Sequence, residues 1–273
     1  MSPFGANLAR RVGTAVVALP ALLAAFFLGP PSLTVALVAV ALLLGLWEFF
    51  RLLEARRLRP LRRTGSLLTL AIFADVACPG WAGHPVWPLA ALLLLGLTLL
   101  PGRELTERIP DAAGTLLGAV YLGALGGTLA GLRVLEPASA GAWRLVLLLA
   151  IVMASDTLAF FSGHALGRHR LAPALSPGKT IEGACGGILG GVAGALVVRA
   201  LGLPSLPLGH ALALGVVVSA MGILGDLDES LLKRWAGVKE SGILFPGHGG
   251  MLDRLDGLLF GAPALYYYFH YFP

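Results

Sequence analysis

Residues 33–50 read LTVALVAVALLLGLWEFF, and Glu48 is the only charged residue in this stretch. Its length approaches the roughly 20 apolar residues that an α-helix needs to cross a bilayer. Similar stretches recur along the whole chain, in which 57% of the 273 residues are hydrophobic and 13% are charged. Because about a quarter of the residues of a soluble domain are charged, the composition predicts an integral membrane protein.

Apolar runs of this kind predict an all-α, polytopic membrane protein with about nine transmembrane helices. Asp75 weakens the third run, and Trp81 and Trp87 flank the fourth, as aromatic residues do at a membrane interface. We expect residues 1–110 to form a lipid-facing scaffold of helices and residues 111–273 to form a catalytic region. The predicted spans are 12–28, 33–50, 66–78, 86–100, 112–132, 144–161, 183–201, 208–224 and 258–272.

The distribution of cations predicts the orientation. If the N-terminus is cytoplasmic, all but three of the 20 Lys and Arg lie on the cytoplasmic side; the exceptions are Arg133, Arg144 and Arg199. This asymmetry is what the positive-inside rule requires. The net charge of +5 therefore reflects membrane topology rather than nucleic-acid binding. Cys78 and Cys185 have neither metal-ligand spacing nor a disulfide pattern.

One segment interrupts the apolar pattern: residues 225–256 read GDLDESLLKRWAGVKESGILFPGHGGMLDRLD. It contains six acidic residues, four basic residues and one histidine around a glycine-rich turn. Mg²⁺ prefers oxygen ligands, and its coordination shell commonly includes phosphate oxygens of a substrate. Lys and Arg neutralise further phosphate charge. The predicted topology places this segment in the cytoplasm, where nucleotides and Mg²⁺ are available.

The acidic residues of this segment allow two interpretations. If the eighth helix continues past residue 224, Asp226 and Ser230 lie one turn apart, and Glu229 and Lys233 form a second such pair. A solvated helix end with ion pairs would explain this part alone. Asp253 and Asp256 recur after the turn, however, and two separated carboxylate groups can converge on one ion.

The glycine turn, residues 246–250, lies before a predicted helix that starts near Met251. Its glycines allow the backbone to approach a ligand and to point N–H groups at it, and the positive end of the helix favours an anion there. His248 could donate to a phosphate oxygen or transfer a proton. The alternative is a plain flexible turn with His248 exposed.

Asp156 lies about 10 Å inside the cytoplasmic end of the sixth predicted span. A carboxylate at this depth is costly and is by default a functional candidate; the alternative is a structural partner for a polar residue of a neighbouring helix. We assign structural roles to Glu48 and Asp75, which are isolated acidic residues in or beside apolar runs.

The sequence Gly178-Lys179-Thr180 is similar to the end of a phosphate-binding P-loop. That motif needs a glycine where this chain has Pro173, and no strand precedes it, so the P-loop is excluded. Thr180 is instead expected to cap the seventh helix, with Glu182 in its first turn. Lys179 remains a candidate phosphate contact.

The pattern Ser230-x-Leu-Lys-Arg-x₄-Lys-Glu-Ser-Gly-x₂-Phe-Pro-Gly-His-Gly-Gly-Met-x-Asp-Arg-Leu-Asp256 closely resembles the signature of the phosphatidate cytidylyltransferase (CDP-diacylglycerol synthase) family. Ser155-Asp-Thr157, Ser176-Pro-x-Lys-Thr-x-Glu-Gly183 and Gly225-Asp-Leu-x-Glu-Ser230 resemble the same family, so the likeness covers the chain from about residue 144. The chain departs from the family pattern at Glu240, usually Asp, and at Gly178 and Ile181, usually Lys and Trp.

The resemblance implies a nucleotidyltransferase of phospholipid biosynthesis in the inner (plasma) membrane, with its active site on the cytoplasmic side. It would convert CTP and phosphatidic acid to CDP-diacylglycerol and pyrophosphate with Mg²⁺, with or without a second, monovalent cation. Its partners would be CTP, phosphatidic acid and membrane lipids. Whether it forms a homodimer is left open.

The resemblance also implies roles for individual residues. The metal ligands would be Asp226 and Asp253, with Asp256 and Asp156 as further candidates. Ser230, Lys233 and Arg234 would contact phosphates as parts of the catalytic set. The remaining substrate contacts would come from Lys179, Lys239, His248, Gly249, Gly250 and Arg254.

Two other functions remain open on the sequence. A CTP-dependent lipid kinase of the polyprenol type would use similar phosphate-binding groups but would need a base to activate a hydroxyl. A transporter would place ionisable residues near the membrane midplane on several helices, whereas here they gather toward one face.

Overall fold

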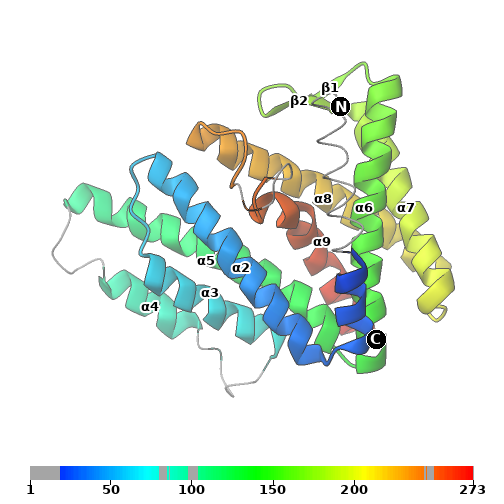
Figure 1. Cartoon of the computed structure of the whole chain (residues 1–273), viewed down its shortest axis with the longest axis horizontal. Helices are drawn as coiled ribbons and strands as arrows, with labels where there is room; N and C mark the ends of the chain where they lie inside the picture. The colour runs from blue at the N-terminus through cyan, green and yellow to red at the C-terminus, as the bar shows by residue number, and fades with distance from the viewer. Residues whose placement is uncertain are drawn as a thin grey trace.

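The structure, a computed structural model, describes residues 19–79, 85, 87–97, 104–242, 244 and 249–272. Helices dominate this part of the chain, which confirms the predicted fold class (Figure 1). Each predicted span contains one helix, and the first is described from Leu19 onward. The helices are Leu19–Leu28, α2 (Pro31–Ala55), α3 (Arg62–Ala77), α4 (Trp87–Leu97), α5 (Leu105–Val134), α6 (Gly141–Leu166), α7 (Ile181–Gly202), α8 (Leu208–Ala236) and α9 (Leu252–Tyr271).

Five helices in the described residues are long and apolar enough to cross a membrane: α2, α5, α6 together with the short 3₁₀ helix η1 (Ala138–Ala140), α7 and α8. The others fall short in length or hydropathy, so nine crossings and a cytoplasmic N-terminus stay predictions. Large apolar side chains such as Leu89 and Leu201, each 70% exposed, lie on the outer surface. Such exposure suits contact with lipid.

Helices α8 and α5 extend well beyond their predicted spans. Helix α8 continues past residue 224 to Ala236, because residues 226–236 include good helix formers, and it ends at Gly237 in the left-handed conformation (φ 78°). Helix α5 begins at Leu105, before the predicted span 112–132. The predicted division of the chain between residues 110 and 111 lies within α5, beside Pro110, and stays a prediction.

The predicted polar loop 162–182 contains the end of α6 and a small antiparallel hairpin, β1 (Arg170–Ala172) and β2 (Ser176–Thr180). Thr180 caps α7, as predicted: its hydroxyl accepts a hydrogen bond from Gly183 N at 3.0 Å. Asp75 joins α3 to α4, because its carboxylate accepts a hydrogen bond from Trp87 N at 3.2 Å. This contact agrees with the structural role expected for Asp75.

Helix α5 packs against α2, α3 and α9 and so lies between the N-terminal helices and the C-terminal ones (Figure 1). Glycines on its surface allow the close approach. A Cβ atom added at Gly123 would lie 2.8 Å from the carbonyl oxygen of Thr69 in α3, and one at Gly118 would lie 2.7 Å from the ring of Phe49 in α2. The distance between these helices is therefore fixed by the absence of a side chain.

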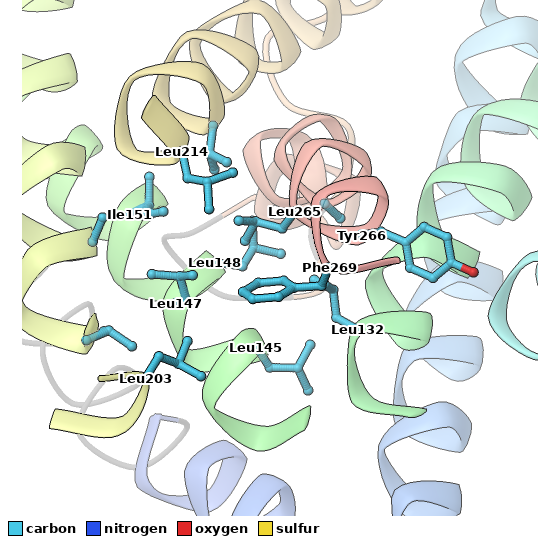
Figure 2. Packing of buried hydrophobic residues seen from close by; sticks show 14 of the residues in the cluster. Leu132, Leu145, Leu147, Leu148, Ile151, Leu203, Leu214, Leu265, Tyr266 and Phe269 are labelled. Carbon is cyan, nitrogen blue, oxygen red and sulfur yellow. The ribbon is translucent and has the colours of Figure 1, made fainter. Parts of the chain in front are cut away.

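The largest cluster of buried apolar residues joins α6, α7, α8 and α9. Figure 2 shows Leu145, Leu147 and Leu148 of α6 gathered near Phe269 of α9, with Leu214 of α8 above them. Burying a leucine or phenylalanine side chain fully contributes roughly 1.5–3 kcal/mol in water. In the membrane, close packing between helices replaces much of this contribution. The cluster fixes the positions from which α8 and α9 present their polar ends.

The packing of α5 yields a test of stability. Gly123→Ala should lower the melting temperature in detergent by several degrees, because the new methyl group meets the backbone of α3, and overpacking typically costs about 1–3 kcal/mol. Gly96→Ala in α4 is the matched control, since a Cβ atom there meets nothing within 4 Å. Equal melting temperatures of the two variants would contradict the packing described for α5.

Candidate functional site

Polar side chains of α8, the first turn of α9 and the hairpin gather beside one another. Helix α9 runs along α8 in the middle of the molecule (Figure 1). Asp226 and Glu229 lie on α8, and Asp256 lies on α9. One carboxylate oxygen of each lies within 4.8 Å of the others. The structure thus brings together the acidic groups that the sequence placed before and after the glycine turn.

The Asp226–Glu229–Asp256 group fits a divalent cation. Glu229 is 1% exposed, and its Oε1 atom is buried without a hydrogen-bond partner. An unpartnered carboxylate oxygen is costly to bury, and a cation bound between the three groups would satisfy it. Helical spacing in the sequence paired Glu229 only with Lys233, and Glu229 was not among the predicted metal ligands. Its spacing of three residues from Asp226 was the available signal, because such residues are neighbours on a helix surface.

Lys233 of α8 forms ion pairs with one carboxylate of α8 and one of α9. Its Nζ atom lies 2.6 Å from Glu229 Oε2 and 2.6 Å from Asp253 Oδ1. The ion pair with Glu229 is the one that the helical spacing predicted. The side chains of Glu229, Lys233 and Asp253 are 2%, 14% and 9% exposed, so both ion pairs are largely out of contact with water.

Asp253 is surrounded by donors. Its Oδ2 atom accepts hydrogen bonds from Ser241 N at 3.0 Å, Ser241 Oγ at 2.8 Å and Gly250 N at 2.8 Å. Burial alone would raise the pKa of Asp253, but hydrogen bonds, among them those from Lys233, Gly250 and Ser241, hold it well below its usual range. Asp253 therefore remains ionised at neutral pH. It adjoins the Asp226–Glu229–Asp256 group through Lys233 and is not one of its three members.

The hairpin contributes a second cation. Lys179 Nζ lies 2.5 Å from Asp226 Oδ2. Nε of Arg234 on α8 donates a hydrogen bond to the carbonyl oxygen of Leu175, in the turn of the hairpin, at 3.2 Å. These two contacts attach the hairpin to α8, and the first brings Lys179 to the carboxylates. The role of Lys179 as a phosphate contact stays a prediction.

A cavity of about 540 Å³ opens beside this ion pair, between α6, α7, α8 and the hairpin. Its polar lining includes Asp156 as well as Lys179 and Asp226, so three of the predicted site residues face the same space. Its full lining is Asp156, Ala159, Phe160, Gly163, His164, Gly167, Arg170, Leu171, Gly178, Lys179, Thr180, Gly183, Ala184, Ile223 and Asp226.

The remaining predicted residues occupy different positions. Ser230 is half-buried on α8, one turn beyond Asp226. Gly249 and Gly250 are buried, and Gly249 has a φ of 77°, which glycine adopts without strain. Arg254 is exposed in the first turn of α9, and Lys239 is exposed beyond the end of α8. His248 lies outside the described residues.

The chain is similar to several known proteins. Residues 9–272 match the model of the cytidylyltransferase family. A phosphatidate cytidylyltransferase of Synechocystis sp. is 34% identical over 262 residues, which cover 85% of this chain and 87% of that protein. The phosphatidate cytidylyltransferase of Bacillus subtilis is 32% identical over 270 residues, which cover 96% of this chain and 97% of that protein. One from Brucella abortus is 45% identical over 150 residues, about half of each chain.

The buried ion pairs predict a selective loss of stability. Lys233→Met should lower the melting temperature markedly, because removing one partner of a buried ion pair typically costs roughly 3–5 kcal/mol. Lys239→Met removes the same charge from an exposed position and should have little effect. Added Mg²⁺ should raise the melting temperature of Lys233→Met, since a divalent ion can compensate the carboxylates. If both variants melt like the unmodified protein, Lys233 is not the buried bridge described.

Proposed function

The chain belongs to the cytidylyltransferase family, and from this membership we propose that it transfers CMP from CTP to phosphatidic acid. The products are CDP-diacylglycerol and pyrophosphate. The alignments with two relatives named phosphatidate cytidylyltransferase cover most of each relative and most of this chain, which supports this substrate pair.

The observation that carries the proposal is the convergence of Lys179 and Asp226 at the 540 Å³ cavity, next to Glu229 and Asp256. The two cations and the carboxylates of the site match the needs of a triphosphate bound with a metal ion. If this helix end were merely solvated, Glu229 would not be 1% exposed with a carboxylate oxygen, Oε1, that lacks a hydrogen-bond partner.

In the proposed reaction, a phosphate oxygen of phosphatidic acid attacks the α-phosphorus of CTP. A new P–O bond forms, the bond between the α-phosphorus and the bridging oxygen to the β-phosphate breaks, and pyrophosphate leaves with that oxygen. The phosphate monoester is largely ionised at neutral pH, so no strong general base is required. Positioning and charge neutralisation supply the catalysis, as in other phosphoryl-type transfers.

The carboxylates are proposed to hold a divalent ion, Mg²⁺ in the first instance. Asp226, Glu229 and Asp256 offer oxygens within 4.8 Å of one another, and Asp253 adjoins them through Lys233. Asp156 faces the same cavity and is the more distant candidate. When bound, the ion would neutralise phosphate charge and orient the triphosphate.

The cations and the glycine turn are proposed to bind phosphates. Lys179 and Lys233 lie against the carboxylates, and both can turn an N–H group toward a phosphate oxygen while keeping a carboxylate contact. Ser230 and Arg234 follow on the same helix. The further contacts are assigned to Lys239, His248, Gly249, Gly250 and Arg254.

The site is proposed to lie at the cytoplasmic face of the plasma membrane. The predicted cation asymmetry supports this orientation, since all but three of the 20 Lys and Arg fall on one side. Apolar side chains near the cavity, such as Phe160 and Phe161 at 68% and 61% exposed, are available to lipid. Phosphatidic acid would then enter from the bilayer and CTP from water.

A double-label assay tests the reaction. Purified protein is given phosphatidic acid, Mg²⁺ and CTP labelled either in cytidine or in the γ-phosphate. We expect the cytidine label in the lipid product and the γ-label in released pyrophosphate. A γ-label in the lipid would instead identify a lipid kinase, and no transfer of either label would contradict both enzymatic functions.

Two substitutions of acidic residues test the site. Asp253→Asn should lower turnover by at least about a hundredfold, because it removes the charge that faces Lys233 and the proposed ion. Glu240→Asp, at an exposed position where the family usually has Asp, should retain nearly full activity. Turnover is measured on protein that elutes as a folded species in detergent. Full activity of Asp253→Asn would exclude this carboxylate from the site.

A further inference from the structure

Glu48 is a buried carboxylate of the N-terminal helices that reaches the start of α9. It lies on α2 and is 2% exposed. Its Oε1 atom accepts a hydrogen bond from Met251 N at 3.0 Å, and its Oε2 atom accepts one from Leu252 N at 2.8 Å. These are backbone N–H groups at the N-terminus of α9, which have no carbonyl partner inside the helix. A side chain about 200 residues earlier in the chain therefore caps this helix.

Ser241 connects Glu48 to Asp253. Its hydroxyl oxygen lies 3.0 Å from Glu48 Oε2 and 2.8 Å from Asp253 Oδ2. A serine hydroxyl carries one proton, so it donates to one carboxylate at a time, and backbone N–H groups hold the other. The two carboxylates are thus parts of one hydrogen-bond network around the turn.

The backbone packs closely on the Glu48 carboxylate. A Cβ atom added at Gly250 would collide with Glu48 Oε2 and Ser241 Oγ, and one added at Gly242 would collide with Glu48 Oε1. Glycine at these two positions allows the turn to close on the side chain. Gly242 and Gly250 therefore lie directly against the Glu48 carboxylate.

We propose that Glu48 is a positioning residue of the cytidylyl-transfer site, acting through Ser241 and the start of α9 to aim Asp253. The inference rests on the proposed function for the identity of the reaction. It also gives the N-terminal helices a part in the site, beyond that of a scaffold. Glu48 is not a member of the Asp226–Glu229–Asp256 group, and its proposed effect passes through the orientation of Asp253.

A matched pair of buried carboxylates separates positioning from stability. Glu48→Gln keeps the size of the side chain but replaces one carboxylate oxygen with an amide NH₂ group. This group cannot accept a hydrogen bond from a backbone N–H group or from the Ser241 hydroxyl. Asp111→Asn is the control: Asp111 is also buried in the N-terminal half, at 5% exposure, and accepts a hydrogen bond from Arg59 N at 2.7 Å. Asp111 lies on α5, whereas Glu48 lies on α2 and Asp253 on α9.

The first readout is the affinity of the substrate-free protein for Mn²⁺, measured by electron paramagnetic resonance. Glu48→Gln should weaken Mn²⁺ binding about tenfold, because a displaced Asp253 would release Lys233, which holds Glu229 of the carboxylate group, and the loss of residues that orient metal ligands typically has an effect of this size. Asp111→Asn should leave it unchanged. The KM for CTP should rise in Glu48→Gln, while the KM for phosphatidic acid changes little.

Unchanged Mn²⁺ affinity in Glu48→Gln, or an equal loss in both variants, would overturn the proposal. Should Glu48→Gln fail to fold, Ser241→Ala takes its place, because it removes the bridging hydroxyl and keeps the Glu48 cap. A folded Ser241→Ala with unchanged Mn²⁺ affinity would overturn the proposal equally. If the proposed function itself is wrong, the unmodified protein will not transfer cytidine, and this result distinguishes that failure from a failure of the role proposed for Glu48.

Discussion

The contact of Lys233 with two carboxylates of different helices is the interaction on which the site depends. Glu229 and Asp253 are almost completely buried, and buried charges without partners are strongly destabilising. The ammonium group forms ion pairs with both and so joins α9 to α8. Once these helices are joined, Asp226 and Asp256 also meet, and the hairpin can add Lys179. The local charge balance and the packing of the apolar cluster therefore favour the same arrangement.

The two halves of the chain meet at this point. The motifs that resemble the family signature lie in the C-terminal half, yet the first turn of α9 is capped by Glu48 of α2. Helix α5 lies between the halves and approaches its neighbours closely through glycines. The N-terminal helices thus hold the start of α9 through Glu48. An account of the site that begins at residue 144 would leave out one of its supports.

The apolar runs predicted where helices lie, because burial in a bilayer imposes one pattern on every span. Helix ends were harder to predict: residues 226–236 lose the apolar pattern but keep helix-forming residues, and only Gly237 ends α8. The ion pair of Glu229 and Lys233 followed from helical spacing. The short hairpin carried too few residues for a strand pattern. Glu48 was recognised as structural, but no local signal links it to residues 241–252, since the contact depends on tertiary packing.

Helix α8 has a consequence for where chemistry can occur relative to the lipid surface. Its 29 residues measure about 43 Å at 1.5 Å per residue, whereas a bilayer's hydrocarbon layer is about 30 Å thick. Counted from Leu208, a crossing of about 20 residues ends near Leu227. In the proposed orientation, with a crossing that starts at Leu208, the same helix would carry Asp226, Glu229 and Lys233 to the level of the lipid headgroups. A membrane of different thickness would then shift these side chains relative to the headgroups, and we expect bilayer composition to affect turnover.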